Sequence, residues 1–184
     1  MAISINSNPA LTAALGLASA TVAFTTDATP AIQTTATSAA NGNGLTLASA
    51  TGIIAGDFLA VEGGAFDGVS PYISAVNGLT GNNANVVFPS VRQAVSGAVC
   101  NRMERIETRY KANKLVLTNL TNGDTYTWQV GMALGSATKV AGGGGTTTVP
   151  NNTFANRSNC VAIHPNILPA SSSFTLQCFY SYYA

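Results

Sequence analysis

Hydrophobic and polar residues alternate with a period of two in the last third of the chain. In 125–130 the apolar Tyr126, Trp128 and Val130 alternate with polar residues, which is typical of a strand with one buried face. An apolar stretch at 114–120 precedes it, and Asn122-Gly123 lies between the two. Asn and Gly tolerate the positive φ of a tight turn, so we predict a β-hairpin over 114–130. The alternation at 173–183 predicts a further strand.

Short apolar stretches separated by turn residues fill the middle of the chain. We predict strands at 45–47, 58–61, 72–76 and 86–88. Asp57, which follows Gly56, is predicted to cap the turn before the second of these strands. Ser90 is predicted to cap a short helix whose apolar positions extend to Val99. The run from Gly142 to Thr148 is predicted to be a flexible loop.

The N-terminal part differs in composition from the rest, because Ala, Thr, Ser and Asn dominate it. Asn8-Pro9 predicts the start of a short helix, and Pro30 within the β-branched stretch 21–37 predicts an extended arm or an edge strand. We therefore predict an extended N-terminal arm over 1–47 and a β domain over 48–184. The fold class is all-β, a single β-sandwich or barrel-like domain with one or two short helices.

The chain is unusually poor in charge. Only 8% of its 184 residues are charged and the net charge is +1, whereas charged residues make up about 25% of an ordinary domain. The near-zero net charge and the absence of Lys and Arg from the first 91 residues argue against nucleic acid as a main ligand, so we expect no direct sequence-specific nucleic-acid binding. We also expect no membrane span, because no apolar stretch reaches about 18 residues. Low net charge favours association, which points to a permanent homo-oligomer.

Candidate chemistry is sparse. His164 is the single histidine and sits between apolar residues and before a proline, so we expect a packed or surface histidine rather than a catalytic one. Cys160 and Cys178 could meet across paired strands, but buried thiols, together with Cys100, are the preferred interpretation. Their spacing matches no usual zinc site. We therefore predict a protein that is not an enzyme and has no catalytic residues, cofactor or metal.

Two regions are candidate assembly contacts. Seven of the fifteen charges fall within 102–114. As a strand this segment would direct Arg105, Glu107, Arg109 and Lys111 to one side and Ile106 and Tyr110 to the other; as a helix, Met103, Ile106 and Tyr110 would share a face. The C-terminal tyrosines offer flat apolar area with a polar tip, for a partner, a carbohydrate or a core. The candidate contacts are Arg105, Glu107, Arg109, Lys111, Tyr180, Tyr182 and Tyr183.

The segment 46–61, with Gly56-Asp57 leading into a strand, is followed by Asp67-Gly68 and a second strand at 72–76. This pattern, with the Thr/Ala/Ser/Asn/Gly-rich composition, resembles structural proteins of tailed bacteriophages. Both capsid decoration (cement) proteins and tail tube proteins contain such stretches. The resemblance covers about a third of the chain and implies a virion protein made in the host cytoplasm.

The resemblance implies two roles. A decoration protein would bind the major capsid protein, with the arm over 1–47 lying on the shell. A tail tube subunit would form rings with identical subunits, but tube lumens are often acidic, and the neutral charge therefore favours decoration. A receptor- or glycan-binding β module is the third hypothesis, and it rests on the tyrosine-rich end.

Overall fold

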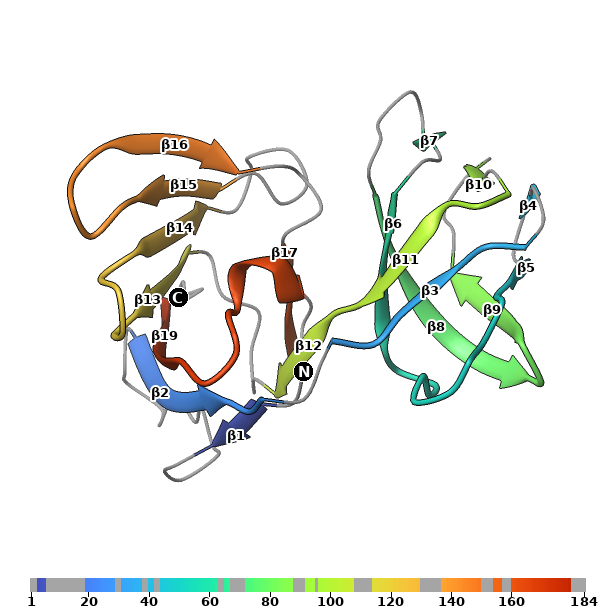
Figure 1. Ribbon diagram of the computed structural model, residues 1–184, viewed down its shortest axis with the longest axis horizontal. Coiled ribbons are helices and arrows are strands. Elements are labelled where there is room, and N and C mark those ends of the chain that lie inside the picture. The colour runs from blue at the N-terminus through green and yellow to red at the C-terminus, as the bar shows by residue number, and fades with distance from the viewer. Residues whose placement is uncertain are drawn as a thin grey trace, which may run out of the picture. The chain divides into compact units, whose positions relative to one another are not determined.

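The structure is a computed structural model that describes residues 3–5, 19–28, 31–37, 40–41, 44–62, 65–66, 72–87, 92–94, 96–107, 114–129, 137–149, 154–156 and 160–179. Within these residues the chain forms nineteen strands and one 3-10 turn, which confirms the all-β prediction. The chain divides into two compact units (Figure 1). Unit 1 comprises 1–30 and 105–184, and unit 2 comprises 31–104.

A seven-stranded antiparallel sheet is the larger layer of unit 1 (Figure 1). The alternation predicted from the sequence is present on its central strands, where every second side chain is buried. The predicted hairpin is thereby confirmed over 114–129, and the predicted C-terminal strand over 173–179. In spatial order the strands are β1 (Ile3–Ile5), β2 (Ser19–Thr26), β19 (Ser173–Phe179), β13 (Lys114–Asn119), β14 (Thr125–Gln129), β15 (Ala137–Val140) and β16 (Thr146–Val149).

A three-stranded sheet supplies the other layer of unit 1's core. It consists of β12 (Glu104–Glu107), β18 (Cys160–Ile163) and β17 (Phe154–Asn156), and the 3-10 turn η1 (Pro165–Ile167) follows β18. Both sheets contribute to one hydrophobic cluster, because a sheet must bury its apolar face against another element. The cluster includes Phe24, Trp128 and Phe174 from the large sheet with Ile106, Val161, Ile163 and Leu168 from the second layer.

Unit 2 closes into a barrel. Its six-stranded sheet has the order β3 (Gln33–Thr35), β11 (Val99–Arg102), β6 (Phe58–Glu62), β8 (Tyr72–Thr80), β9 (Asn83–Val87) and β5 (Gly44–Thr46). The two outer strands meet beyond their ends, because Ala36 pairs with Leu47 in an antiparallel bridge. The Thr37 N–H donates to the Thr46 carbonyl at 2.9 Å, and the Ala48 N–H donates to the Thr35 carbonyl at 2.8 Å. Closure satisfies the backbone groups that an open edge would expose.

A small three-stranded sheet completes the described part of unit 2, with the order β4 (Ala40–Asn41), β10 (Arg92–Ala94) and β7 (Ala65–Phe66). The barrel core is a second hydrophobic cluster, separate from that of unit 1. It includes Leu45, Leu47, Leu59, Val61 and Cys100.

The structure differs from the predicted arm over 1–47. In the described part of that range, β2 lies inside the large sheet between β1 and β19, and β3 and β5 belong to the barrel. The strand β2 ends at Thr26, before Pro30, so the proline does not restrict it to an edge. Accordingly, the division into 1–47 and 48–184 is replaced by two units with a boundary inside the predicted arm.

Two local predictions are wrong. The expected helix over 91–99 is absent from the described residues of that segment, which form β10 and the start of β11. Valines recur there at helical spacing, but pairing of 99–102 with β6 decides the conformation. The expected loop at 142–148 contains a strand, because Thr146–Thr148 pair with β15. The helix predicted from Asn8 lies outside the described residues.

Phe24→Ala tests the core of unit 1. Phe24 stacks on Phe174 with ring centroids 5.4 Å apart, and both are at most 1% exposed. Removing the ring should lower the free energy of unfolding by about 3–5 kcal/mol. Urea unfolding monitored by Trp128 fluorescence measures this, since the single tryptophan lies in the same core. Leu45→Ala, which creates a cavity in unit 2, is the control and should move the Trp128 transition less. An unchanged transition in Phe24→Ala would contradict the placement of Phe24 in the core of unit 1.

Candidate assembly surface

The outer face of the seven-stranded sheet carries two rows of side chains that cross six strands from β2 to β16. The inward residues between the two rows are buried on β2, β19, β13 and β14, whereas the residues of the rows themselves are half-buried or exposed. Eight of the twelve are threonines and none is charged. We call these twelve residues the threonine face. One row contains Ala23, Thr175, Thr118, Thr125, Val140 and Thr146, and the other contains Thr21, Gln177, Val116, Thr127, Thr138 and Thr148.

The threonine face lacks charged residues, as the cores of protein interfaces do. Charged residues are depleted in the cores of protein interfaces, whereas solvated faces usually carry Lys and Glu. Threonines paired across neighbouring strands also stabilise the sheet. The nearest charge in the adjoining row is Lys114, whose Nζ lies 5.1 Å from the centroid of the Phe179 ring. The threonine face can therefore meet another surface without desolvating a charge of its own.

The edge strand β16 borders the threonine face. Thr146, Thr147 and Thr148 are exposed, and no strand of the described residues pairs with the outer edge of β16. Proteins usually protect such an edge with Lys, Pro or a bulge within the strand, and β16 contains none of these. The edge therefore offers unpaired backbone groups for strand addition.

The hairpin register determines which backbone groups point outward. The loop before β16 is closed by the Ala141 N–H, which donates to the Gly145 carbonyl at 3.0 Å. Hydrogen-bonded pairs recur at every second residue of an antiparallel ladder, so the pair Lys139 and Thr147 is also hydrogen-bonded. The N–H and C=O groups of Thr146 and Thr148 consequently point away from β15.

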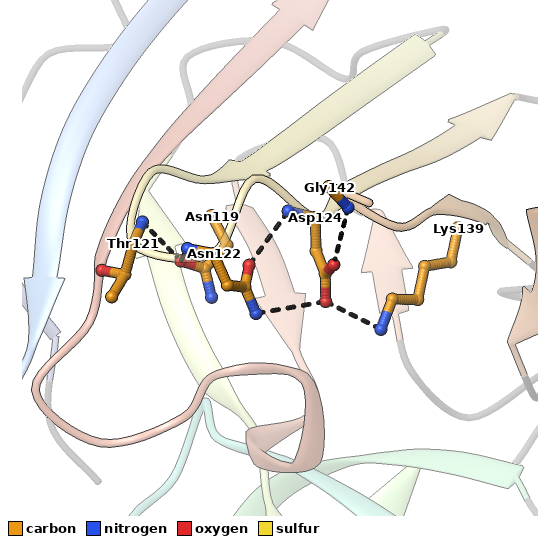
Figure 2. Close-up of polar contacts among 6 residues, drawn as sticks. All are labelled: Asn119, Thr121, Asn122, Asp124, Lys139 and Gly142. Atoms are coloured by element: carbon orange, nitrogen blue, oxygen red, sulfur yellow. Dashed lines mark hydrogen bonds and ion pairs between the residues drawn. The ribbon is translucent and has the colours of Figure 1, made fainter. Parts of the chain in front are cut away.

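A polar network lies in the turn between β13 and β14 (Figure 2). The Asn119 carboxamide oxygen accepts hydrogen bonds from the backbone N–H of Thr121 at 2.8 Å and of Asn122 at 3.3 Å. The Asn122 side chain accepts from the Asp124 N–H at 2.9 Å and donates to the Asp124 carboxylate at 3.2 Å. Such side-chain to backbone bonds fix a turn that lacks regular strand pairing.

Asp124 connects this turn to the β15–β16 hairpin (Figure 2). Its carboxylate accepts from the Gly142 N–H at 3.2 Å and pairs with the Lys139 ammonium at 2.7 Å. The Lys139 Nζ also lies 5.5 Å from the centroid of the Tyr126 ring. The hydrogen bond with Lys139 lowers the pKa of Asp124 below its ordinary 3.8 and raises the pKa of Lys139 above its ordinary 10.5. The network thus positions the hairpin that carries the β16 edge.

Two of the predicted contact residues lie on β12. Arg105 Nη2 and Glu107 Oε1 are 2.7 Å apart, and the Glu107 side chain is 68% exposed. The described residues 104–107 form a strand and not the alternative helix, and Ile106 between the two charged residues is buried. This pair belongs to the three-stranded sheet and not to the threonine face. The other candidates, Arg109, Lys111, Tyr180, Tyr182 and Tyr183, lie outside the described residues.

The threonine face was missed as a site by the sequence analysis. Its local signal was the polar alternation of Thr125 and Thr127 with aromatic residues. That signal predicts a solvated strand face, and only the register shows that equivalent residues of six strands line up. Thr146 and Thr148 were assigned to a loop because four glycines precede them.

The buried side chains of Asp57 and His164 make hydrogen bonds that stabilise local turns. The turn cap predicted for Asp57 is confirmed, since its carboxylate accepts from the Ile54 N–H at 2.9 Å and from Arg102 Nε at 3.0 Å. His164 is buried, which decides between the packed and the surface alternatives, and its Nδ1 accepts from the Asn166 N–H at 3.1 Å at the start of η1. In the part of the chain that the structure describes, no three His, Cys, Asp or Glu side chains cluster to hold a metal ion.

All three cysteines are buried thiols that form no disulfide, which confirms the preferred interpretation. Burial raises the pKa of the Cys100 thiol to about 11. A thiol at such a pKa is almost entirely protonated at neutral pH and is a poor nucleophile. Cys100 therefore behaves as a small apolar residue of the barrel core.

Comparison with protein-family models finds no match for the chain. Comparisons with curated proteins and with solved structures likewise find no match. Among the described residues, no helix is long and apolar enough to span a membrane.

Gly142→Ala should weaken the contact between the two hairpins. A Cβ at Gly142 would lie 2.1 Å from the Asn122 carbonyl oxygen, so the backbone must shift, at a cost of about 1–3 kcal/mol. Gly143→Ala is the matched control, because its Cβ would meet nothing within 4 Å. Urea unfolding followed by Trp128 fluorescence compares them; equal stability of the two variants would contradict the proposed close approach.

Asp124→Asn tests the ion pair through its pH dependence. The folded-state pKa of Asp124 is depressed, so its contribution is fully present above the unfolded value of about 3.9 and is lost as pH falls through the folded value. The stability difference between wild type and Asp124→Asn should therefore shrink below about pH 4. Glu107→Gln, in an exposed pair, should change stability by less than about 1 kcal/mol. A pH-independent Asp124→Asn difference would exclude the ion pair as its cause.

Proposed function

We propose that the chain is a non-enzymatic structural subunit of a tailed-bacteriophage particle and acts as a capsid decoration (cement) protein. The observation that carries this proposal is the uncharged threonine face, which is continuous with the unpaired edge of β16. A face and an edge of this kind suit lasting contact with other protein surfaces. The proposed partners are the major capsid protein or identical subunits.

The free-energy contributions that would stabilise such an assembly add up over several contacts. Strand addition at an edge contributes about 1 kcal/mol net for each backbone hydrogen bond. Apolar burial, including threonine methyl groups, contributes about 25 cal/mol per Å². On a symmetric shell each subunit contacts several neighbours, and linked contacts bind far more tightly than any one alone. Modest interfaces can therefore stabilise a particle.

The assignment to phage particles is supported by the resemblance of 46–61 and 72–76 to their structural proteins. In the structure the Asp57 turn leads into β6, and β6 pairs with β8, so the two segments form adjacent strands. The low charge of the chain also suits a subunit whose surface is covered by neighbours. The product would reside in the virion after synthesis in the host cytoplasm.

A tail tube or other tail protein is the alternative, because an unpaired edge strand would equally serve to join identical subunits into rings. The third hypothesis, a receptor- or glycan-binding module, depends on Tyr180, Tyr182 and Tyr183, which lie outside the described residues. Deleting 1–47 does not separate these roles, because it would remove Val22 and Phe24 from the core of unit 1.

Immunogold electron microscopy of phage particles from the source organism tests the location. We expect label over the heads, whereas label along the tails would support the tail alternative and unlabelled particles would contradict both. Add-back of purified protein to particles that lack it then tests the surface. Thr138→Lys, which places a charge on the threonine face, should reduce attachment at least about tenfold. Thr80→Lys, an equal charge at an exposed position of unit 2, should attach like the wild type.

A further inference from the structure

The outward backbone groups of β16 are arranged symmetrically about Thr147. Thr146 and Thr148 each direct an N–H and a C=O away from β15, whereas Thr147 is bonded to Lys139 on the inner side. The side chains of Thr146 and Thr148 both belong to the threonine face. An edge whose donors, acceptors and side chains are the same in either direction from one residue is complementary to itself.

We propose that β16 pairs with β16 of a second copy of this chain, antiparallel about a two-fold axis at Thr147. This inference deepens the proposed function and rests on its assignment of the β16 edge to assembly. In this register Thr146 lies opposite Thr148 of the second copy, and the two pairs exchange about four backbone hydrogen bonds. The interface is isologous, as in most homodimers, and joins the two large sheets into one.

Charge favours a second copy as the occupant of this edge. The strand β16 contains no charged residue. The charge on the adjacent strand is Lys139, which is neutralised by Asp124 at 2.7 Å. Two copies therefore meet without repulsion between like charges, which is the usual penalty when identical surfaces associate.

Continuity of the threonine face favours the same occupant. Across the two-fold axis, the row that ends at Thr146 continues at Thr148 of the second copy. The row that ends at Thr148 continues at Thr146 of the second copy. Opposed residues of an antiparallel ladder project to the same face, so the threonines of both copies form one surface. The turn network and the close approach of Gly142 hold the hairpin in place before pairing, which lowers the cost of ordering it.

Sedimentation velocity of the full chain over a range of concentrations tests the pairing. We expect a reversible monomer–dimer equilibrium. Thr148→Pro removes an outward N–H and leaves the bonded pair Lys139 and Thr147 intact, so it should raise the dimer Kd at least about tenfold. Thr148→Lys should do the same by charge, whereas Thr21→Lys, an equal charge on β2, should not. Trp128 fluorescence must show that each variant is folded.

The register has its own test. In Thr147→Cys the two introduced thiols lie directly opposite each other in a non-hydrogen-bonded pair, where Cβ atoms approach to about 4.5–5.5 Å. Mild oxidation should yield a covalent dimer, and the buried native cysteines should not react. Thr138→Cys, exposed on the neighbouring strand, should not yield one. A covalent dimer from Thr138→Cys alone would overturn the register.

The outcomes also separate this inference from the proposed function. A chain that remains monomeric at every concentration, or whose dimer is unaffected by Thr148→Pro, overturns the pairing even when the particles are labelled. Unlabelled particles overturn the phage assignment even when the dimer forms as described.

Discussion

The pairing of β2 with β19 is the contact on which unit 1 depends. It joins two segments that lie on either side of unit 2 in the sequence, with Phe24 stacked on Phe174 and Thr26 bonded to Ser172 at 2.9 Å. Closing so long a loop costs conformational entropy before any contact repays it. Burial of the aromatic pair and the hydrogen bonds of the long antiparallel ladder together offset this entropy. The large sheet and its threonine face therefore form only when both ends of the unit meet.

The two units differ in whether the edge strands of their main sheets are paired. Unit 2 closes its sheet on itself through the bridge between Ala36 and Leu47, so these two edge strands satisfy each other. Among the strands that the structure describes, the large sheet of unit 1 stays open at β16, where the backbone of Thr146 and Thr148 is directed outward. An open edge without a protecting charge is a hazard for a protein that works alone. For a protein that assembles, it is the place where assembly can occur.

The chain contains few charged residues, and those that form ion pairs hold specific turns. Asp124 bonds Lys139 and Gly142 and so holds one hairpin tip against the next, while Asp57 caps a turn and pairs with Arg102. Neither pair lies on the threonine face. Charge thus fixes local geometry, and the broad outer surface of the sheet is left to hydroxyl and methyl groups.

The sequence by itself determined the features that depend on neighbouring residues. Alternation over 114–130 predicted the hairpin, and Gly56-Asp57 predicted the capped turn. Arg105 and Glu107 form an ion pair on β12, and their role as assembly contacts stays a prediction.

Only the tertiary structure decided which strands lie beside one another. Local composition predicts an arm for β2, a loop for Thr146–Thr148 and a helix for 91–99. Hydrogen bonds to distant strands overrode that preference, since strand conformation is stabilised by a partner that no local window contains. The threonine face follows from the same cause: alternation determines which side chains point outward, but only the register of six strands brings them together on one surface.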